Sequence, residues 1–148
     1  MPRRLEQWRG LTPWERRLLL RLVFLLPVIG ASLRLLGFKR SRDLLAWLSR
    51  PSRSQSPAHP PATTAETAHR IARLVGIAAY HGPYRATCLR RALALWWLLR
   101  RRGIPAELRI GVRKDGDEFQ AHAWVEHEGV PLNDSVDVSL RFAVFQVH

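Results

Sequence analysis

The chain has 148 residues, of which 47% are hydrophobic, enough for one globular domain with an appendage but short for two independent domains. It carries 24 Lys and Arg against 12 Asp and Glu, and residues 1–50 hold eleven basic and three acidic residues, or +8 of the net charge of +12. One cysteine excludes an intramolecular disulfide and a multi-cysteine metal cluster. With no signal-peptide pattern at the start, we expect a cytoplasmic protein.

The N-terminal segment is predicted to be helical. Residues Thr12 to Glu15 form a capping-box pattern with proline at the first helical position, followed by an apolar helix over 18–26. Pro27 and Gly30 predict a bend or an end there, and a second short helix is expected over 42–49.

The charge of this segment suits acidic lipid, nucleic acid or an acidic partner protein. Its longest uncharged stretch, residues 22–33, is too short to cross a bilayer as a helix. Peripheral membrane contact, or use as a helix pair that covers the rest of the chain, stays open.

A proline-rich stretch without apolar periodicity follows and is typical of a linker. We therefore divide the chain into a basic helical segment (1–50), a linker (51–62) and a folded domain (63–148). The domain is expected to open with a helix capped by Thr63 or Thr64 and ending before His81. Its apolar side would hold Ala68, Ile71, Ala72, Val75 and Ala79.

Cys88 stands at the start of the next helix, with Thr87 as a plausible N-cap. The free backbone N–H groups and the positive dipole end of a helix stabilise a thiolate, and three arginines lie nearby. Residues 92–99 are apolar on every side, which predicts a central, buried helix. A lone cysteine in such a helix is also often a packed small side chain.

From Ala106 the apolar period changes to the alternation of strands. A two-residue turn at Asp115-Gly116 predicts a hairpin in which Val112 faces Phe119, Ile110 faces Ala121 and Leu108 faces Ala123. The other face would carry Arg109, Gly111, Gln120, His122 and Trp124, with Arg109 opposite His122. We expect the Cys88 helix to cover this second face and to place His122 in a cleft.

The second turn decides where Asp134 lies. A three-residue loop over 127–129, with Gly129 in the left-handed position, would pair His122 directly with Asp134. A two-residue loop would send Asp134 to the opposite face. The first alternative is favoured, and it makes Cys88, His122 and Asp134 a nucleophile, a general base and an orienting carboxylate.

Two further side chains, Trp124 and Gln120, are predicted to contact substrate. The backbone N–H of Cys88 is one candidate donor for an oxyanion. The remaining histidines lack ligand spacing with acidic or cysteine residues, so we predict no metal and no cofactor.

The motifs around these residues carry a resemblance. Cys88 to Ala106, Ile110-Gly111-Val112-Arg113, Ala121 to Glu126 and Pro131-Leu132-Asn133-Asp134 are similar to the core of the bacterial lasso-peptide leader peptidases, which are transglutaminase-like cysteine proteases. The resemblance implies an α+β fold in which a central cysteine-bearing helix packs on an antiparallel sheet, preceded by a helical segment. It also implies catalytic roles for the cysteine, histidine and aspartate.

The implied activity is removal of the leader from a ribosomally synthesised antibiotic-type precursor peptide, before a cyclase forms the macrolactam. Residues 1–62 are too few for the leader-binding domain that some family members carry, so a separate recognition protein is expected. Acyl transfer to an amine, by the same triad, and a noncatalytic basic adaptor remain alternatives. No nucleic-acid-binding motif is present.

Overall fold

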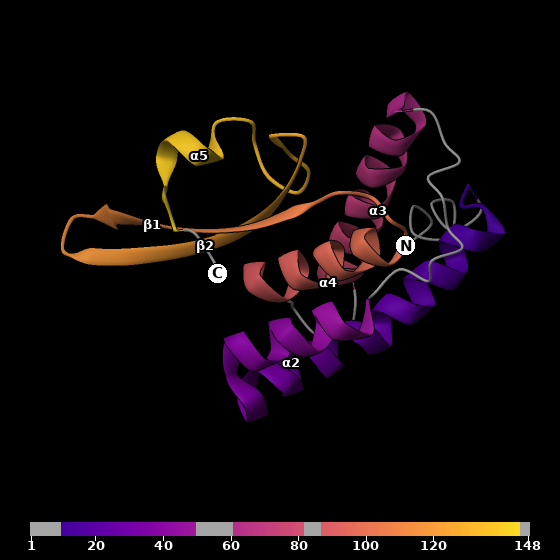
Figure 1. The fold of residues 1–148 in the computed structure, drawn as a ribbon, viewed down its shortest axis with the longest axis horizontal. Helices are drawn as coiled ribbons and strands as arrows, with labels where there is room; N and C mark the ends of the chain where they lie inside the picture. The colour runs from indigo at the N-terminus through magenta and orange to yellow at the C-terminus, as the bar shows by residue number, and fades with distance from the viewer. Residues whose placement is uncertain (1–9, 50–60, 82–86, 146–148) are drawn as a thin grey trace.

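A computed structural model describes residues 10–49, 61–81 and 87–145. Three long helices precede a small sheet, and a single short helix lies inside the C-terminal strand region (Figure 1). The elements are α2 (Pro13–Leu48), α3 (Pro61–His81), α4 (Cys88–Arg101), β1 (Glu107–Asp115), β2 (Glu118–His127), β3 (Val130–Pro131), α5 (Val138–Arg141) and β4 (Ala143–Phe145).

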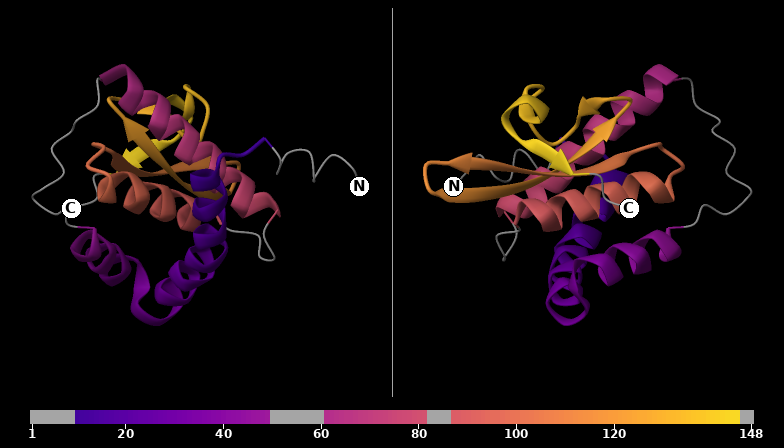
Figure 2. Two further views of the ribbon diagram at one scale, coloured as in Figure 1. Left: turned by 90° about the vertical axis from the view of Figure 1, so that its right-hand side faces the viewer. Right: turned by 60° about the vertical axis from the view of Figure 1, so that its left-hand side comes forward.

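The four strands form one antiparallel sheet in the order β3-β2-β1-β4. Helix α4 contacts β2 as well as α2 and α3, so it is the central helix of the molecule. Figure 2 shows α4 between the sheet and α2. The predicted α+β class, with a central helix on an antiparallel sheet and a helical segment ahead of it, is confirmed.

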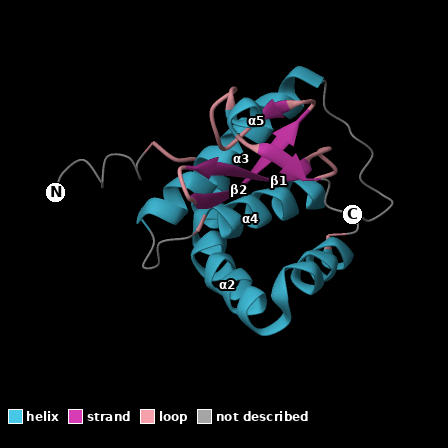
Figure 3. Ribbon diagram, turned by 90° about the vertical axis from the view of Figure 1, so that its left-hand side faces the viewer, coloured by secondary structure: helices cyan, strands magenta, loops and turns pink. Residues whose placement is uncertain are grey.

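Helix α2 begins as predicted, because the Glu15 carboxylate accepts hydrogen bonds from the backbone N–H and hydroxyl of Thr12, at 2.8 and 2.9 Å. The predicted break at Pro27 and Gly30 is wrong. The helix continues through both residues, held by the buried side chains of its inner face, and bends at Gly37, whose φ of 77° is a left-handed conformation that suits glycine. Figure 3 shows the two arms that result.

Because α2 continues through Pro27 and Gly30, the prediction that this segment is too short to cross a bilayer no longer holds on length alone. By length and composition, α2 is apolar enough to cross a membrane, although about a third of the relevant window is buried against the rest of the protein. A core helix passes the same test, so composition alone does not distinguish the two uses.

Helix α3 starts at Pro61, earlier than predicted, so Thr63 and Thr64 lie inside it and do not cap it. Its predicted apolar side is buried as expected. The predicted linker lies mostly outside the described residues, and the domain limits stay a prediction.

Helix α4 has the predicted start and burial. Thr87 is the N-cap, and its hydroxyl accepts from the backbone N–H of Arg90 at 3.4 Å. The helix ends in a Schellman motif, in which the N–H groups of Gly103 and Ile104 donate to the carbonyls of Arg100 and Leu99. Seven side chains between residues 92 and 99 are buried, which makes α4 the centre of the main core.

The register of the hairpin differs by two residues from the prediction. Asp115 pairs with Glu118, so Gly116 and Asp117 form the turn, and Gly116 takes the positive φ of 63° that the first turn position demands. A shift of two residues keeps every side chain on its predicted face. It does change the cross-strand neighbours, so that His122 lies opposite Gly111 and Arg109 lies opposite Trp124.

The two faces of the hairpin are covered by different elements. Ala123 and Val125 belong to the main core with α4, whereas Trp124 forms a second, small core with Val138 and Phe142. Helices α4 and α5 accordingly lie on opposite sides of the hairpin (Figure 1). The expectation that α4 covers the His122 face is therefore wrong, because the small and aliphatic side chains of the other face are the ones that allow close contact with a helix.

Candidate active site

Cys88 is the first residue of α4 and carries a partly exposed free thiol. The local charges have specific partners in the described part of the chain. The guanidinium of Arg91 lies 5.7 Å from the ring centre of Tyr80. That of Arg90 lies so close to α2 that a Cβ on Gly30 would come within 2.7 Å of its Cζ. Both side chains thus point toward other groups, Arg91 toward Tyr80 and Arg90 toward α2, and stabilisation of a thiolate by the helix start and these charges stays a prediction.

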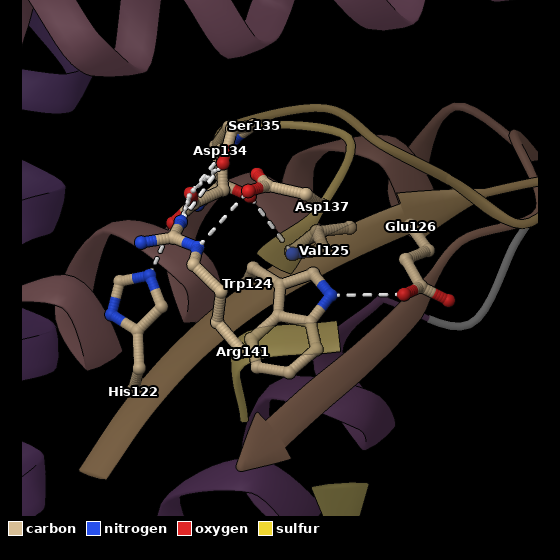
Figure 4. A network of polar contacts seen from close by, with 9 residues as sticks. His122, Trp124, Val125, Glu126, Asp134, Ser135, Asp137 and Arg141 are labelled. Atoms are coloured by element: carbon tan, nitrogen blue, oxygen red, sulfur yellow. Dashed lines mark hydrogen bonds and ion pairs between the residues drawn. The ribbon is translucent and has the colours of Figure 1, made fainter. Parts of the chain in front are cut away.

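His122 and Asp134 are in contact. Nε2 of the imidazole is hydrogen-bonded to Oδ2 of the carboxylate (Figure 4). The ring is fixed from its sides by Phe142 and Trp124, whose ring centres lie 5.2 and 6.0 Å away. Because the carboxylate accepts the proton on Nε2, the neutral ring has its lone pair on Nδ1. The predicted proximity of these two residues is found, and the free ring nitrogen is Nδ1.

The predicted loop before Asp134 is nevertheless wrong. His127 pairs with Val130, so the turn has two residues, Glu128 and Gly129, with φ values of 51° and 78°. Such a turn fits the type I′ pattern that suits hairpins. A regular ladder from this register would place Asp134 opposite Ala123, on the α4 face.

A break in the β2–β3 ladder brings Asp134 to the His122 face instead. Leu132 donates its backbone N–H to the carbonyl of Val125 at 2.9 Å, as in a regular pair. The return bond goes to a side chain, because the N–H of Val125 donates to Oδ1 of Asn133 at 2.8 Å. The amide of Asn133 thus replaces a backbone carbonyl, the chain leaves the strand, and Asp134 turns to the face of His122. No local sequence pattern predicted this replacement.

Asp134 is held by several donors besides His122. Its Oδ1 accepts from the backbone N–H of Ser135 at 2.7 Å and from Nη2 of Arg141 at 3.3 Å. Burial raises the pKa of Asp134, but the hydrogen bonds from His122 and Ser135 and the charge of the imidazole outweigh it, so the pKa lies below its ordinary value. Asp134 is therefore an anion that orients His122. Arg141 also bonds Oγ of Ser135 at 2.8 Å, which ties α5 to this pair.

A buried polar group missed by the sequence analysis lies next to the pair. Nε1 of Trp124 donates to Oε1 of Glu126 at 2.9 Å, and Nε of Arg109 donates to Oε2 at 3.1 Å. Arg109 thus compensates Glu126 and does not face His122, contrary to the predicted register. The alternation of His122, Trp124 and Glu126 along one strand face was the available signal.

The two predicted substrate contacts differ in accessibility. Trp124 has 0% exposure beneath Phe142 and Val138, so contact with substrate requires that this cover move. Gln120 is exposed, and its Oε1 accepts two hydrogen bonds from Arg113, at 3.0 and 2.8 Å. Both roles stay predictions.

The sulfur is not joined to the pair: within the described residues no hydrogen bond connects Cys88 and His122. After α4 the chain enters β1 at Glu107, opposite Glu126, so the C-terminal end of α4 lies near the Glu126 end of β2. The 14-residue helix is about 20 Å long. From Glu126 back to His122 the strand covers about 13 Å. A helix of this length, laid along β2 from its Glu126 end, would reach the level of His122 on the other side of the sheet.

The described strands leave the outer edge of β2 unpaired at the level of His122. Strand β3 pairs only with Glu126 and His127, so within the described residues no strand covers His122 from that side. No group of three or more His, Cys, Asp or Glu side chains in the described ranges could hold a metal ion.

Comparison with known proteins identifies the family. No curated protein and no solved structure gives a significant match. The family model described as "Transglutaminase-like superfamily" matches residues 32–147, well over half of the chain and all three candidate catalytic residues. The chain is therefore a member of the transglutaminase-like superfamily.

Proposed function

We propose that the protein is a cysteine peptidase that removes the leader from a lasso-peptide precursor, before a separate cyclase forms the macrolactam. Family membership supports cysteine-based hydrolysis or acyl transfer. The observation that carries the catalytic assignment is the bond between His122 and Asp134 in a chain whose only cysteine begins the central helix. The choice of lasso-peptide leaders rests on the resemblance of the motifs from Cys88 to Asp134.

The roles follow from the ring atoms of His122. Asp134 holds the proton on Nε2, so Nδ1 is the atom that takes the thiol proton of Cys88. The anionic Asp134 then stabilises the imidazolium that forms. Because Ser135 and Arg141 fix the carboxylate, they act as positioning residues for the base.

The reaction has two steps. The thiolate attacks the carbonyl carbon of the scissile peptide bond, and the oxyanion that forms is stabilised by the backbone N–H of Cys88. Nδ1–H then protonates the leaving amine, which departs as the new N-terminus of the core peptide, and the leader remains as a thioester. Water attacks the thioester and gives its proton to Nδ1, and the leader leaves with a free carboxyl group.

The proposal requires that Cys88 reach Nδ1 around the edge of β2 that no described strand pairs with at His122. The sulfur is at the very start of α4, and no strand blocks this edge at His122 in the described part of the chain. A movement of the first turn of α4, or a rotation of the His122 side chain toward the edge, would bring the two groups together. We assign this closure to the binding of the precursor and its recognition protein.

The activity test mixes the protein with a lasso-peptide precursor, with and without the separate recognition protein, and follows leader release by mass spectrometry. We expect release by the wild type, none by Cys88→Ala and a strongly reduced rate for His122→Ala. Phe119→Ala, which changes an exposed side chain at the hairpin tip, is the matched control and should keep full activity. Release that persists in Cys88→Ala would contradict the nucleophile assignment.

Acyl transfer is the competing outcome in the same assay, because family membership fits it equally. An added primary amine would compete with water for the thioester and would appear as a covalent adduct at the carboxyl end of the leader. Predominant adduct formation, at low amine concentration, would replace the peptidase proposal by an amine acyltransferase.

A further inference from the structure

The outer side of α2 carries an exposed apolar stripe that the proposed function does not use. Leu20, Phe24, Val28, Ala31 and Leu35 follow one another at intervals of three or four residues, so they share one face of the helix. The four large side chains are 56%, 72%, 62% and 83% exposed, respectively. An exposed apolar surface of this continuity marks an interaction site.

The opposite face of the same helix is already occupied. Leu19, Leu22, Leu26 and Ile29 are buried in the main core, against the other helices. In Figure 2, α2 lies at the periphery of the molecule, with α4 between it and the sheet. The helix therefore has two apolar faces, and only one of them contributes to the described fold.

Charge indicates the chemistry of the missing contact. Seven Lys and Arg, and no Asp or Glu, lie between Arg16 and Arg42. They lie at the two ends of the apolar stripe: Arg17 and Arg21 at its start, and Arg34, Lys39 and Arg40 around its end. A helix with an exposed apolar face and cations at both ends of that face suits an element that rests in the interface of an anionic membrane.

A cavity beside the end of the stripe fits the same ligand. It has a volume of about 530 Å³, with walls that include Leu26, Pro27 and Leu35. Two guanidinium groups, those of Arg34 and Arg90, also line it. Apolar walls next to two cations match the acyl chain and the phosphate of an anionic phospholipid.

We infer that the outer face of α2 binds the surface of a membrane that contains anionic phospholipid, with the stripe from Leu20 to Leu35 in the interface. A spanning arrangement is disfavoured, because lipid would have to surround a helix whose inner face is packed in the protein core. This inference is independent of the proposed peptidase activity, since neither the stripe nor its margins include Cys88, His122 or Asp134.

The test is co-sedimentation of the full chain with vesicles. We expect binding to vesicles of equal parts phosphatidylcholine and phosphatidylglycerol, and little binding to phosphatidylcholine alone. High salt should weaken binding, because the arginine contribution is screened. The protein without vesicles must stay in the supernatant, and Cys88→Ala must bind like the wild type.

Single substitutions locate the surface. Phe24→Ser should weaken binding to the anionic vesicles about tenfold, since it removes a large side chain from the apolar interface. Val28→Ser should also weaken binding to the anionic vesicles. It keeps the test valid if Phe24→Ser does not fold. Phe119→Ser is the matched control, because Phe119 is equally exposed, at 76%, but lies on the hairpin. Arg34→Gln should weaken binding to the anionic vesicles several-fold.

Four results would overturn the inference. They are no binding to anionic vesicles, equal binding to phosphatidylcholine alone, an effect of Phe119→Ser as large as that of Phe24→Ser, and resistance of the bound protein to alkaline carbonate. The last would show a spanning helix. An acidic protein that binds the stripe while vesicles do not would assign the surface to a protein partner.

Discussion

The two faces of the β1–β2 hairpin are stabilised by different kinds of interaction. The face toward α4 is apolar, and Ala123 and Val125 merge there with a core built from three helices. On the face toward α5, the described residues form a small core of Trp124 with Val138 and Phe142, and the side chains around it are polar and paired: His122 with Asp134, and Trp124 with Glu126. The first face supplies stability through buried area, and the second supplies orientation through hydrogen bonds.

This division suggests how one strand carries both fold and chemistry. Successive residues of β2 point to opposite faces, so Ala123 can be fixed in the main core while His122 stays accessible to a reacting group. Substitutions on the two faces should therefore separate loss of activity from loss of stability.

The largest expected effect is on activity. His122→Ala should reduce leader release by about 10²–10⁴-fold, the range typical of losing a general base. The free energy of unfolding should change by only about 1 kcal/mol, because the imidazole is partly exposed. Rates come from mass spectrometry and stability from urea unfolding. A His122→Ala variant that loses most of its unfolding free energy along with its activity would contradict the assignment of chemistry and stability to different faces.

The largest expected effect on stability lies on the other face. Leu95→Ala removes a fully buried side chain from α4 and should cost about 2–5 kcal/mol of unfolding free energy. Val138→Ala, in the small core over Trp124, should cost less. Urea unfolding of both variants compares the two cores. A larger loss of unfolding free energy for Val138→Ala would show that the small core, and not the main core, contributes more to stability.

Substitution of Gly111 tests how closely the α5 segment packs on the His122 face of the hairpin. A Cβ at this position would lie 2.8 Å from Cβ of Phe142 and 3.1 Å from Cη2 of Trp124. Gly111→Ala should therefore cost about 1–3 kcal/mol through overpacking. Gly76→Ala is the control, since a Cβ there meets no atom within 4 Å and should be neutral or stabilising in a helix. Similar melting temperatures for both variants would show that the cover is loose.

The smallest expected effect is a pH dependence. The native-state pKa of Asp134 lies below its unfolded value of about 3.9, so its stabilisation is complete above that value and is lost as the pH falls through the native pKa. The wild type should exceed Asp134→Asn in stability by about 1 kcal/mol above about pH 5, and the difference should shrink below about pH 4. Urea unfolding across this range measures it, and a difference that grows on acidification has the wrong sign.

The features that sequence predicted correctly have local causes. The cap at Thr87 and the all-apolar run after Cys88 are short-range signals, and they predicted the start and the burial of α4 correctly. The capping box at Thr12 was equally reliable. The alternation in β2 separated the two faces correctly, even though the hairpin register was shifted by two residues.

The failures concern choices that local patterns leave open. Both hairpin turns have a glycine that fits two loop lengths, so the turn at 128–129 was assigned one residue too long. His122 and Asp134 still met, because the Asn133 side chain broke the ladder. Nor did alternation show which face α4 covers, since the bulk of Trp124 indicated a cover but not the four-residue helix α5 that provides it.

Cysteine crosslinking tests whether Cys88 reaches His122 around the edge of β2, as the peptidase proposal requires. Because Cys88 is the only cysteine, His122→Cys can form one intramolecular disulfide, which requires Cβ atoms about 4 Å apart. Ala121→Cys is the matched control on the opposite face. In the presence of the precursor and its recognition protein, we predict that oxidation crosslinks His122→Cys. Crosslinking of Ala121→Cys alone would show that the sulfur stays on the α4 side and would contradict the peptidase proposal.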